Sequence, residues 1–386
     1  MKWQAAGSAV FALTLFCAGC GASNSSTGDA PIGAKAPITF GQTNPKTGSS
    51  ALLGTSETPG TDAYFKLTNA KGGVQGHNLE LKSLDDNYSP TQALVDAKQL
   101  INQDKVFAFV GPNGTPQTTA VQSVAKPAKV PVVGPQTGGE DLENTLDPNV
   151  FYTFPKYSAD GSTLGKFAQA PGNHIDLSHV GVLYQNDSFG KSILSGLLDS
   201  GVKPVSQLGY DASQSDFSPL AAQFKGAGVT TLFLFSLVGP TVSFLHSLSS
   251  VGITPTLLLD STSASGASID ASGPIVQGAY ISAFIPPLTD LSNPQVAEFV
   301  NAMNKYEPGQ PINAYAAWGW LSAQVAVTGL ENVKGDITRT AYIDALNTLS
   351  TTTIGGPLTY TKTDHTGLKQ QQVLKISGTH RVSTGS

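Results

Sequence analysis

Residues 111–117, which read Gly-Pro-Asn-Gly-Thr-Pro-Gln, could form a binding site for an anion. They follow the apolar run 106–110 (VFAFV), which is typical of a buried strand. Thr115 suits the N-cap of a helix and Pro116 its first position, so the free N–H groups of that helix would point into a cleft. Because a helix N-terminus with a hydroxyl group can receive a carboxylate, the segment predicts a carboxylate site. An ordinary glycine turn followed by a cap is an equally good explanation from these residues alone.

The other reactive side chains argue against an enzyme. The histidines are scattered, without a pair at i, i+4 or an H-E-x-x-H motif, at positions 77, 174, 179, 246, 365 and 380. The chain lacks a G-x-S-x-G elbow, and neither half has a complete G-x-G-x-x-G motif at a strand-to-helix turn. We therefore expect no catalytic residue, no metal site and no cofactor.

The two cysteines lie within the first twenty residues. Residues 5–16 form an uncharged apolar run that has the length of a signal peptide but is too short to span a bilayer. The following C-A-G-C sequence resembles a bacterial lipobox, which predicts a signal peptide over 1–19, a lipid on Cys20 and a flexible tether over 20–36. Cys17 stands where the pattern usually carries Leu, and an ordinary secretory signal with an incidental cysteine is the alternative.

Composition limits the function further. The chain has 386 residues, enough for about two domains, and a formal charge of -5 with 13% charged residues. This charge provides no drive toward nucleic acid or an anionic membrane surface. A chain with 40% hydrophobic residues and so few charges also cannot remain disordered.

From residue 38 onward, short apolar runs alternate with helical patterns, which predicts parallel sheets with crossover helices. The strand-like runs are 38–43, 79–84, 106–110, 130–134, 179–184, 230–235 and 256–260, with a late one at 371–377. Apolar stripes with a 3.6-residue period lie between them, and long helical patterns follow residue 284 at 296–306, 313–330 and 340–349. This order suggests two α/β lobes, with a chain that returns to the first lobe and later contacts the second again.

Several motifs in order resemble the leucine/isoleucine/valine-type substrate-binding proteins of ABC transporters. The first is N-A-K-G-G-V-Q-G at 69–76, followed by Asp85-Asp86 at a strand end and by P-x-x-A-x-x-x-A-x-x-L-I at 90–101. Further matches are D-S-F-G-K at 187–191 and D-F-S-P-L at 216–220. The resemblance extends from about residue 38 to 252 and more loosely to the end of the chain. It implies a structural role for the acid pair.

The resemblance implies a type I periplasmic-binding fold, with two open doubly wound lobes joined by a three-crossing hinge that closes on a ligand in the cleft. We expect the N-terminal lobe to comprise 37–157 plus 285–368, and the C-terminal lobe 158–284 plus 369–386. In open α/β sheets, ligands bind beyond the carboxyl ends of the strands, which agrees with this arrangement.

The resemblance also implies ligand-binding residues in the loops of the first lobe. In the family, the loop with Asn113, Gly114 and Thr115 binds an α-carboxylate, and Thr115 matches the hydroxyl position. In the loop 134–139 (GPQTGG), Gln136 matches a backbone carbonyl position, Thr137 is at or one residue from a threonine position, and Gly138 belongs to the same loop. A glycine turn with positive φ at 138–139 is the alternative.

The positions that would cover the ligand depart from the family pattern. Phe189 matches a ligand-covering tyrosine, whereas Leu237 and Leu53 stand where other aromatic residues are usual. The glutamate that pairs a ligand's ammonium aligns with Ser261, next to Asp260. Either Asp260 takes over that role, or the ligand has no ammonium group, since an unpaired buried carboxylate would be costly. Tyr315 and Trp318 could line the cleft, although such aromatic residues are more often core.

We therefore expect an extracytoplasmic, lipid-anchored and monomeric solute-binding protein of an ABC importer. Its partners would be a small-molecule ligand and a membrane permease, without nucleic acid. The departures favour a small carboxylate or amide with an apolar tail over a standard amino acid. The alternatives are a true branched-chain amino acid binder and a ligand-binding sensor or receptor component of the same fold.

Overall fold

The computed structural model describes residues 1–2, 29–143 and 145–384. The predicted signal peptide, Cys17 and the predicted lipid site Cys20 lie outside the described residues. Within the described ranges, no helix combines the length and the apolar character that a membrane span requires.

Five parallel strands form one sheet, called here the N-terminal sheet, in the order β2-β1-β3-β4-β5. These strands are β1 (Ile38–Asn44), β2 (Leu79–Asp85), β3 (Ala108–Val110), β4 (Val132–Val133) and β5 (Val150–Phe151). The intervening helices are α1 (Ala51–Ala70), α2 (Pro90–Asn102), α3 (Thr115–Ala125) and α4 (Glu140–Glu143). Since the strands are parallel, the loops after β3 and β4 leave the same edge, and Asn113 forms a bridge with Gln136 there.

Seven strands form a second sheet, called here the C-terminal sheet, in the order β14-β13-β10-β9-β8-β6-β7. Its strands are β6 (Val180–Gln185), β7 (Ser206–Tyr210), β8 (Thr231–Phe235), β9 (Thr256–Leu259), β10 (Tyr280–Ala283), β13 (Gln372–Ser377) and β14 (His380–Ser383). Strands β13 and β14 add in antiparallel register. The accompanying helices are α5 (Tyr157–Gln169), α6 (Ser188–Asp199), α7 (Ser218–Gly226), α8 (Val238–Val251) and α9 (Ala267–Ala271), with 3-10 turns at Pro171–Asn173 and Pro274–Val276.

Three further helices and a hairpin lie between β10 and β13 in the sequence. They are α10 (Pro294–Tyr306), α11 (Ala314–Glu331), α12 (Arg339–Leu346) and the strands β11 (Ser350–Thr353) and β12 (Gly356–Thr359). Helix α11 is apolar all round and almost wholly buried, as expected of a core helix. It packs closely on α1, because a Cβ atom at Gly60 or Gly319 would overlap a carbonyl oxygen of the other helix.

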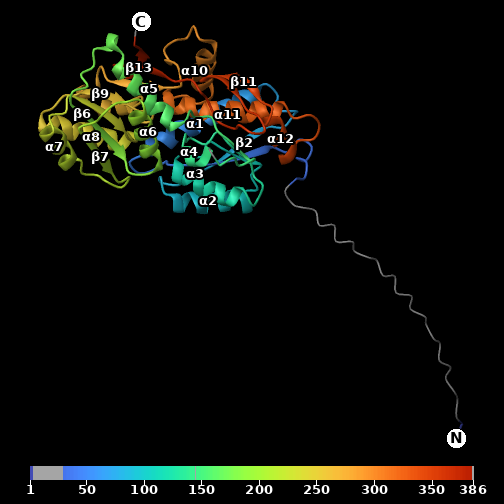
Figure 1. Cartoon of the computed structure of the whole chain (residues 1–386). Helices are drawn as coiled ribbons and strands as arrows, with labels where there is room; N and C mark the ends of the chain where they lie inside the picture. Colours follow the sequence, from blue (N-terminus) through green and yellow to red (C-terminus); the bar gives the residue numbers. More distant parts are fainter. Residues whose placement is uncertain (3–28, 144, 385–386) are drawn as a thin grey trace.

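The chain passes between the two sheets three times. It leaves the N-terminal sheet after β5, returns after β10 to pack α11 on α1, and enters the C-terminal sheet again at β13. Figure 1 shows β6 to β9 with α7 and α8 in one half of the molecule, and α2, α3 and α12 in the other. The loops at the carboxyl ends of both sheets can therefore contribute to one site.

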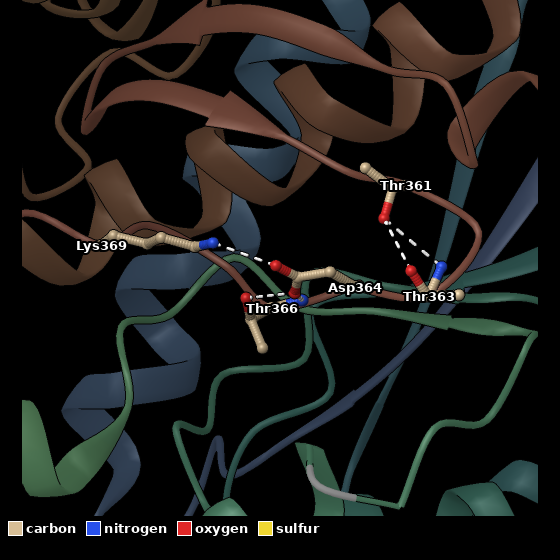
Figure 2. Close-up of polar contacts among 5 residues, drawn as sticks. All are labelled: Thr361, Thr363, Asp364, Thr366 and Lys369. Atoms are coloured by element: carbon tan, nitrogen blue, oxygen red, sulfur yellow. Dashed lines mark hydrogen bonds and ion pairs between the residues drawn. The ribbon is translucent and has the colours of Figure 1, made fainter.

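The segment that leads to β13, the third crossing between the sheets, contains a small polar cluster, shown in Figure 2. The Asp364 carboxylate accepts hydrogen bonds from the Thr366 N–H at 2.9 Å and hydroxyl at 2.5 Å, and pairs with Lys369 Nζ at 3.0 Å. Burial opposes ionisation of Asp364, but the bonds from Thr366 and Lys369 outweigh it and lower the pKa to about 2. The carboxylate therefore remains ionised at any ordinary pH and holds this loop together.

The seven strand-like runs before residue 261 each contain a strand, and the late run 371–377 contains β13, so these predictions are confirmed. The three helical patterns after residue 284 are confirmed as α10, α11 and α12. The predicted lobe boundaries, 37–157 plus 285–368 and 158–284 plus 369–386, stay a prediction.

Candidate functional site

Three hydroxyl groups meet where the loops of the N-terminal sheet approach α5. Thr115 Oγ1 and Thr137 Oγ1 are 2.8 Å apart, and both threonine side chains are buried. The Tyr157 hydroxyl contacts both hydroxyls and the Gly138 N–H. Burial raises the pKa of Tyr157, although the bonds from Thr137, Thr115 and Gly138 act in the opposite direction. The phenol is therefore neutral and can donate a hydrogen bond.

Thr115 belongs to this cluster because it does not cap its own helix. Gly114, with φ +92°, occupies the N-cap position of α3, and Thr115 is the first helical residue. The prediction that Thr115 is the N-cap and Pro116 the first helical residue was wrong by one position. A residue at φ +92° is nearly always glycine, so the cap falls on Gly114 and the Thr115 hydroxyl is left for other contacts.

The loop 134–139 is held from two sides. The Gln136 side chain donates to the Trp318 carbonyl at 3.2 Å and to Ser322 Oγ at 2.9 Å. The Gly138 carbonyl accepts from the Tyr157 N–H at 2.9 Å. The positive-φ explanation for 138–139 is wrong, since neither glycine has a positive φ. Gly138 is instead required by close approach, because a Cβ there would overlap the Pro155 carbonyl oxygen.

The Asn113 side chain contacts Glu57 on α1. Its Nδ2 donates to Glu57 Oε1 at 2.7 Å, and Asn44 Nδ2 donates to Glu57 Oε2 at 3.1 Å. Burial raises the pKa of Glu57 well above its usual value, against the lowering effect of the Asn113 bond. Asn113 therefore fixes the loop to α1, while its backbone N–H bonds to the Thr43 carbonyl at 3.4 Å.

From the C-terminal half, Phe189 on α6 packs against Tyr157. Its ring packs edge-on against the Tyr157 ring, with centroids 5.1 Å apart, and is 1% exposed. Asp187 places it there, because its carboxylate caps α6 by accepting from the N–H groups of Phe189 and Gly190 at 3.0 and 3.3 Å. Phe189 thus lies against Tyr157, one member of the hydroxyl cluster.

A second polar group lies next to this cluster. The side chains of Tyr88, in the loop after β2, and Gln185, at the end of β6, interact. Gln185 also accepts from the Tyr210 hydroxyl at 3.2 Å and donates to Asp187 Oδ2 at 2.6 Å. The Tyr210 hydroxyl oxygen accepts from the Leu237 N–H at 3.3 Å, so the predicted residue Leu237 adjoins this group through its backbone.

Asp260 is wholly buried and anchors its own loop. Its carboxylate accepts from the N–H groups of Ser236 and Thr262, both at 2.7 Å, and from the hydroxyls of Ser263 at 2.7 Å and Thr262 at 2.5 Å. Burial nevertheless raises its pKa. These four donors account for the carboxylate without a ligand ammonium.

Ser261 bonds to Asp160 of α5. Its Oγ donates to Asp160 Oδ2 at 3.1 Å, and Ser282 donates to the other oxygen. Burial and the neighbouring Asp260 raise the pKa of Asp160 to about 7. Arg381 of β14 donates to the Ser261 carbonyl at 2.9 Å, so the C-terminal hairpin braces this loop.

The remaining candidates are core residues. Leu53 on α1 is 1% exposed and belongs to the main hydrophobic cluster, as do Tyr315 and Trp318. The Tyr315 hydroxyl donates to the Thr262 carbonyl at 2.8 Å, which ties α11 to the loop after β9.

The structure thus brings Thr115, Thr137, Gly138 and Phe189 together, and places Asp260 and Ser261 on a separate loop. The residues that sequence reasoning missed are Tyr88, Tyr157, Gln185, Tyr210 and Arg381. A signal for two of them was available: Tyr88 closely follows the acid pair at the end of β2, and Tyr157 lies at the predicted first crossing. A cavity of about 740 Å³ lies elsewhere, between α5, α6 and residues 363–369.

Comparison with known families decides what kind of protein carries this site. The family described as Periplasmic binding protein matches residues 37–380. The chain belongs to this family. The mixed α/β architecture described above is that of type I periplasmic binding proteins.

Among the relatives of this periplasmic binding protein is the Leu/Ile/Val-binding protein homolog 7 of Brucella abortus (strain 2308). It is 27% identical over 321 residues, which cover 78% of this chain and 79% of the relative. A possible leucine/isoleucine/valine-binding protein from Rhodopirellula baltica has a TM-score of 0.83 and 23% identity, covering 92% of this chain and 98% of that one. A fatty acid ABC transporter substrate-binding protein from Thermomonospora curvata has a TM-score of 0.82 and 21% identity, covering 91% and 90%.

Proposed function

We propose that this periplasmic binding protein is the extracytoplasmic solute receptor of an ABC importer. It holds a small ligand between the N-terminal and C-terminal sheets and delivers it to a membrane permease, while an ATPase on another chain supplies the energy. Family membership and the transporter-related names of the similar proteins support this role. A lipid on Cys20 keeps the monomeric protein at the membrane.

The ligand we propose is a small carboxylate or amide with an apolar tail. The observation that carries this choice is the convergence of the Thr115, Thr137 and Tyr157 hydroxyls with the Gly138 N–H at the start of α3. These groups can all donate hydrogen bonds to a carboxylate, and the first turn of α3 favours negative charge. Phe189 supplies an apolar cover beside them.

The two buried acids of the C-terminal half already accept hydrogen bonds from the protein and are therefore poor partners for a ligand ammonium group. Asp260 accepts four hydrogen bonds from its own loop, and Asp160 accepts from Ser261 and Ser282. A buried ammonium group without a free acceptor would bear a large desolvation cost. A ligand without an amine avoids this cost, as a fatty acid or a deaminated branched-chain acid does.

Isothermal titration with paired compounds tests this ligand class. Each amino acid is compared with its deaminated counterpart: leucine with 4-methylpentanoate and valine with 3-methylbutanoate. We expect the deaminated acids to bind more tightly than the amino acids. Tight binding of leucine or valine alone would instead identify a branched-chain amino acid binder.

Native mass spectrometry of the freshly purified protein provides an independent test, because binding proteins of this kind often retain their ligand. We expect an intact carboxylate or amide to be released on denaturation. Recovery of a ligand that the protein converts on incubation would refute the receptor role and indicate an enzyme.

A further inference from the structure

Gly239 lies directly against the backbone of the other half of the molecule. It is the second residue of α8, which accompanies the C-terminal sheet, and it contacts Ser49, in the loop between β1 and α1 of the N-terminal sheet. A Cβ atom at Gly239 would overlap the Ser49 carbonyl oxygen, and would lie 2.9 Å from the carbonyl carbon and 3.1 Å from the Ser49 Cβ. The φ of Gly239 is not positive, so the close approach of the two chains, and not the backbone conformation, requires glycine here.

The loop that carries Ser49 is fixed to the N-terminal sheet. At its start, the carboxylate of Asp85, which ends β2, accepts from the Lys46 N–H at 2.8 Å and from the Thr47 hydroxyl at 2.7 Å. At its end, Ser50 precedes the first residue of α1 and is 3% exposed. The Asp85 carboxylate and the start of α1 therefore hold the Ser49 carbonyl in place from both sides.

The start of α8 is fixed to the C-terminal sheet in a similar way. The Asp260 carboxylate accepts from the Ser236 N–H at 2.7 Å, and the Tyr210 hydroxyl oxygen accepts from the Leu237 N–H at 3.3 Å. Leu237 is the N-cap residue of α8 and is buried. Because each chain is held by its own sheet, a side chain at position 239 is accommodated by moving the two sheets apart.

We propose that Gly239 is an affinity-determining residue, because its lack of a side chain lets α8 close onto Ser49 and so permits the closed, ligand-holding arrangement. Both residues follow the carboxyl ends of parallel strands, β8 and β1, where the loops of the proposed site also lie. The inference rests on the proposed function, since it assigns Gly239 a role in the closing of that same site. When the halves separate, the contact is absent, so a side chain at position 239 penalises the closed state alone. A ligand that binds the closed state then binds more weakly by that penalty.

The test is Gly239→Ala in the full chain, which adds one methyl group at the contact. With 4-methylpentanoate and leucine as probes in isothermal titration, we expect the Kd to rise about 5- to 100-fold, as for one overpacked methyl group. The matched control is Gly226→Ala at the last residue of α7, where an added Cβ meets no atom within 4 Å. This control should leave the Kd unchanged.

Thermal unfolding without ligand separates a role in closure from a merely structural one. Alanine is a better helix former than glycine, and the two halves can separate to avoid the overlap. The Tm of Gly239→Ala should therefore stay within about 2 °C of that of the unsubstituted protein, as should the Tm of Gly226→Ala. An unchanged Kd in Gly239→Ala would overturn the proposal. A Tm loss of more than about 5 °C would also overturn it, because it would show that the two halves are packed together permanently.

A pair of cysteine substitutions tests the contact even if neither probe binds, an outcome that would count against the proposed ligand class only. Cβ atoms at positions 239 and 49 lie 3.1 Å apart, and the slight separation that relieves the overlap brings them to the ~3.8 Å typical of a disulfide. Oxidation of the Ser49→Cys/Gly239→Cys protein should link these two positions in peptide mapping, whereas the Ser49→Cys/Gly226→Cys protein should give no link between 49 and 226. Absence of the 49–239 link would overturn the closure contact while leaving the receptor function intact.

Discussion

The buried Asp86 carboxyl has a raised pKa, and this predicts how the free energy of unfolding changes with pH. The carboxyl is fully buried, and its Oδ1 accepts from the Tyr88 N–H at 2.9 Å. Thr43 Oγ1 lies 3.0 Å from Asp86 Oδ2 and 3.0 Å from Asp96 Oδ2. One hydroxyl has one proton, so Thr43 can form a full hydrogen bond to each of the two acids only when one of them carries a proton. Burial raises the pKa of Asp86 to about 7, which agrees with this requirement.

A carboxyl whose pKa is raised on folding contributes stability below its unfolded pKa, near 3.8, and loses it as the pH rises through 7. At ~1.4 kcal/mol per pKa unit the total is about 4 kcal/mol, of which about 3 kcal/mol is lost between pH 5 and pH 8.5. Asp86→Asn reproduces the neutral form: the amide oxygen accepts from Tyr88, the amide nitrogen donates to Thr43, and the Thr43 hydroxyl donates to Asp96. The variant should therefore escape this loss.

The assay is thermal unfolding of ligand-free protein at pH 5 and pH 8.5. Relative to the unsubstituted protein, Asp86→Asn should gain about 3 kcal/mol between the two pH values. This corresponds to about 4 °C in Tm for a chain of this length, at ~2.1 cal/mol/K per residue. Glu143, another buried acid with a raised pKa, is influenced by Lys156, Glu140 and Asp364 and not by Asp86, so its contribution is the same in both proteins and cancels in the difference.

The neighbouring acid provides the control. Burial opposes ionisation of Asp85, but bonds from the Lys46 N–H at 2.8 Å, the Thr47 hydroxyl at 2.7 Å and the Asn87 N–H at 3.0 Å outweigh it and lower its pKa. Asp85→Asn should therefore lose stability, and most of all at high pH. If Asp86→Asn changes Tm equally at both pH values, or is less stable than the unsubstituted protein at pH 8.5, the shared-proton reasoning is wrong.

Three further substitutions probe the site. Thr115→Ala should weaken binding of the preferred carboxylate about 5-fold in titration while leaving the ligand-free Tm within about 1 °C, because Gly114 and not Thr115 caps α3; a large Tm loss with unchanged affinity would contradict this. Gly138→Ala should cost about 1–3 kcal/mol in urea unfolding, because the new methyl group overlaps the Pro155 carbonyl, and an unaffected midpoint would show that the loop can move aside. Arg381→Met should cost about 2–4 kcal/mol, since it leaves two buried carbonyls of the loop after β9 without their donor; Arg381→Lys should recover part of this, and equal losses in both variants would contradict the hydrogen-bonding role.

The repeating pattern of the chain was readable from the sequence because it is local. The strand runs before residue 261 are continuous apolar segments bounded by turn residues, and the period-3.6 stripes between them lie on helices. Strands such as β5, with two residues, and β7, with the weakly apolar sequence SQLGY, escaped because short or half-exposed strands carry little periodic signal. They become strands through pairing with a neighbour.

The sequence by itself also placed the loops after β3 and β4 beside each other, since the carboxyl ends of parallel strands gather at one sheet edge. Which side chains meet there was decided by the tertiary structure. Tyr157 joins Thr115 and Thr137 through the crossing from β5 to α5, the Tyr88 and Gln185 side chains interact, and Asp260 turns out to satisfy its own loop. These contacts join residues far apart in the chain, and their geometry depends on how the two sheets are set against each other, which no local pattern of residue types encodes.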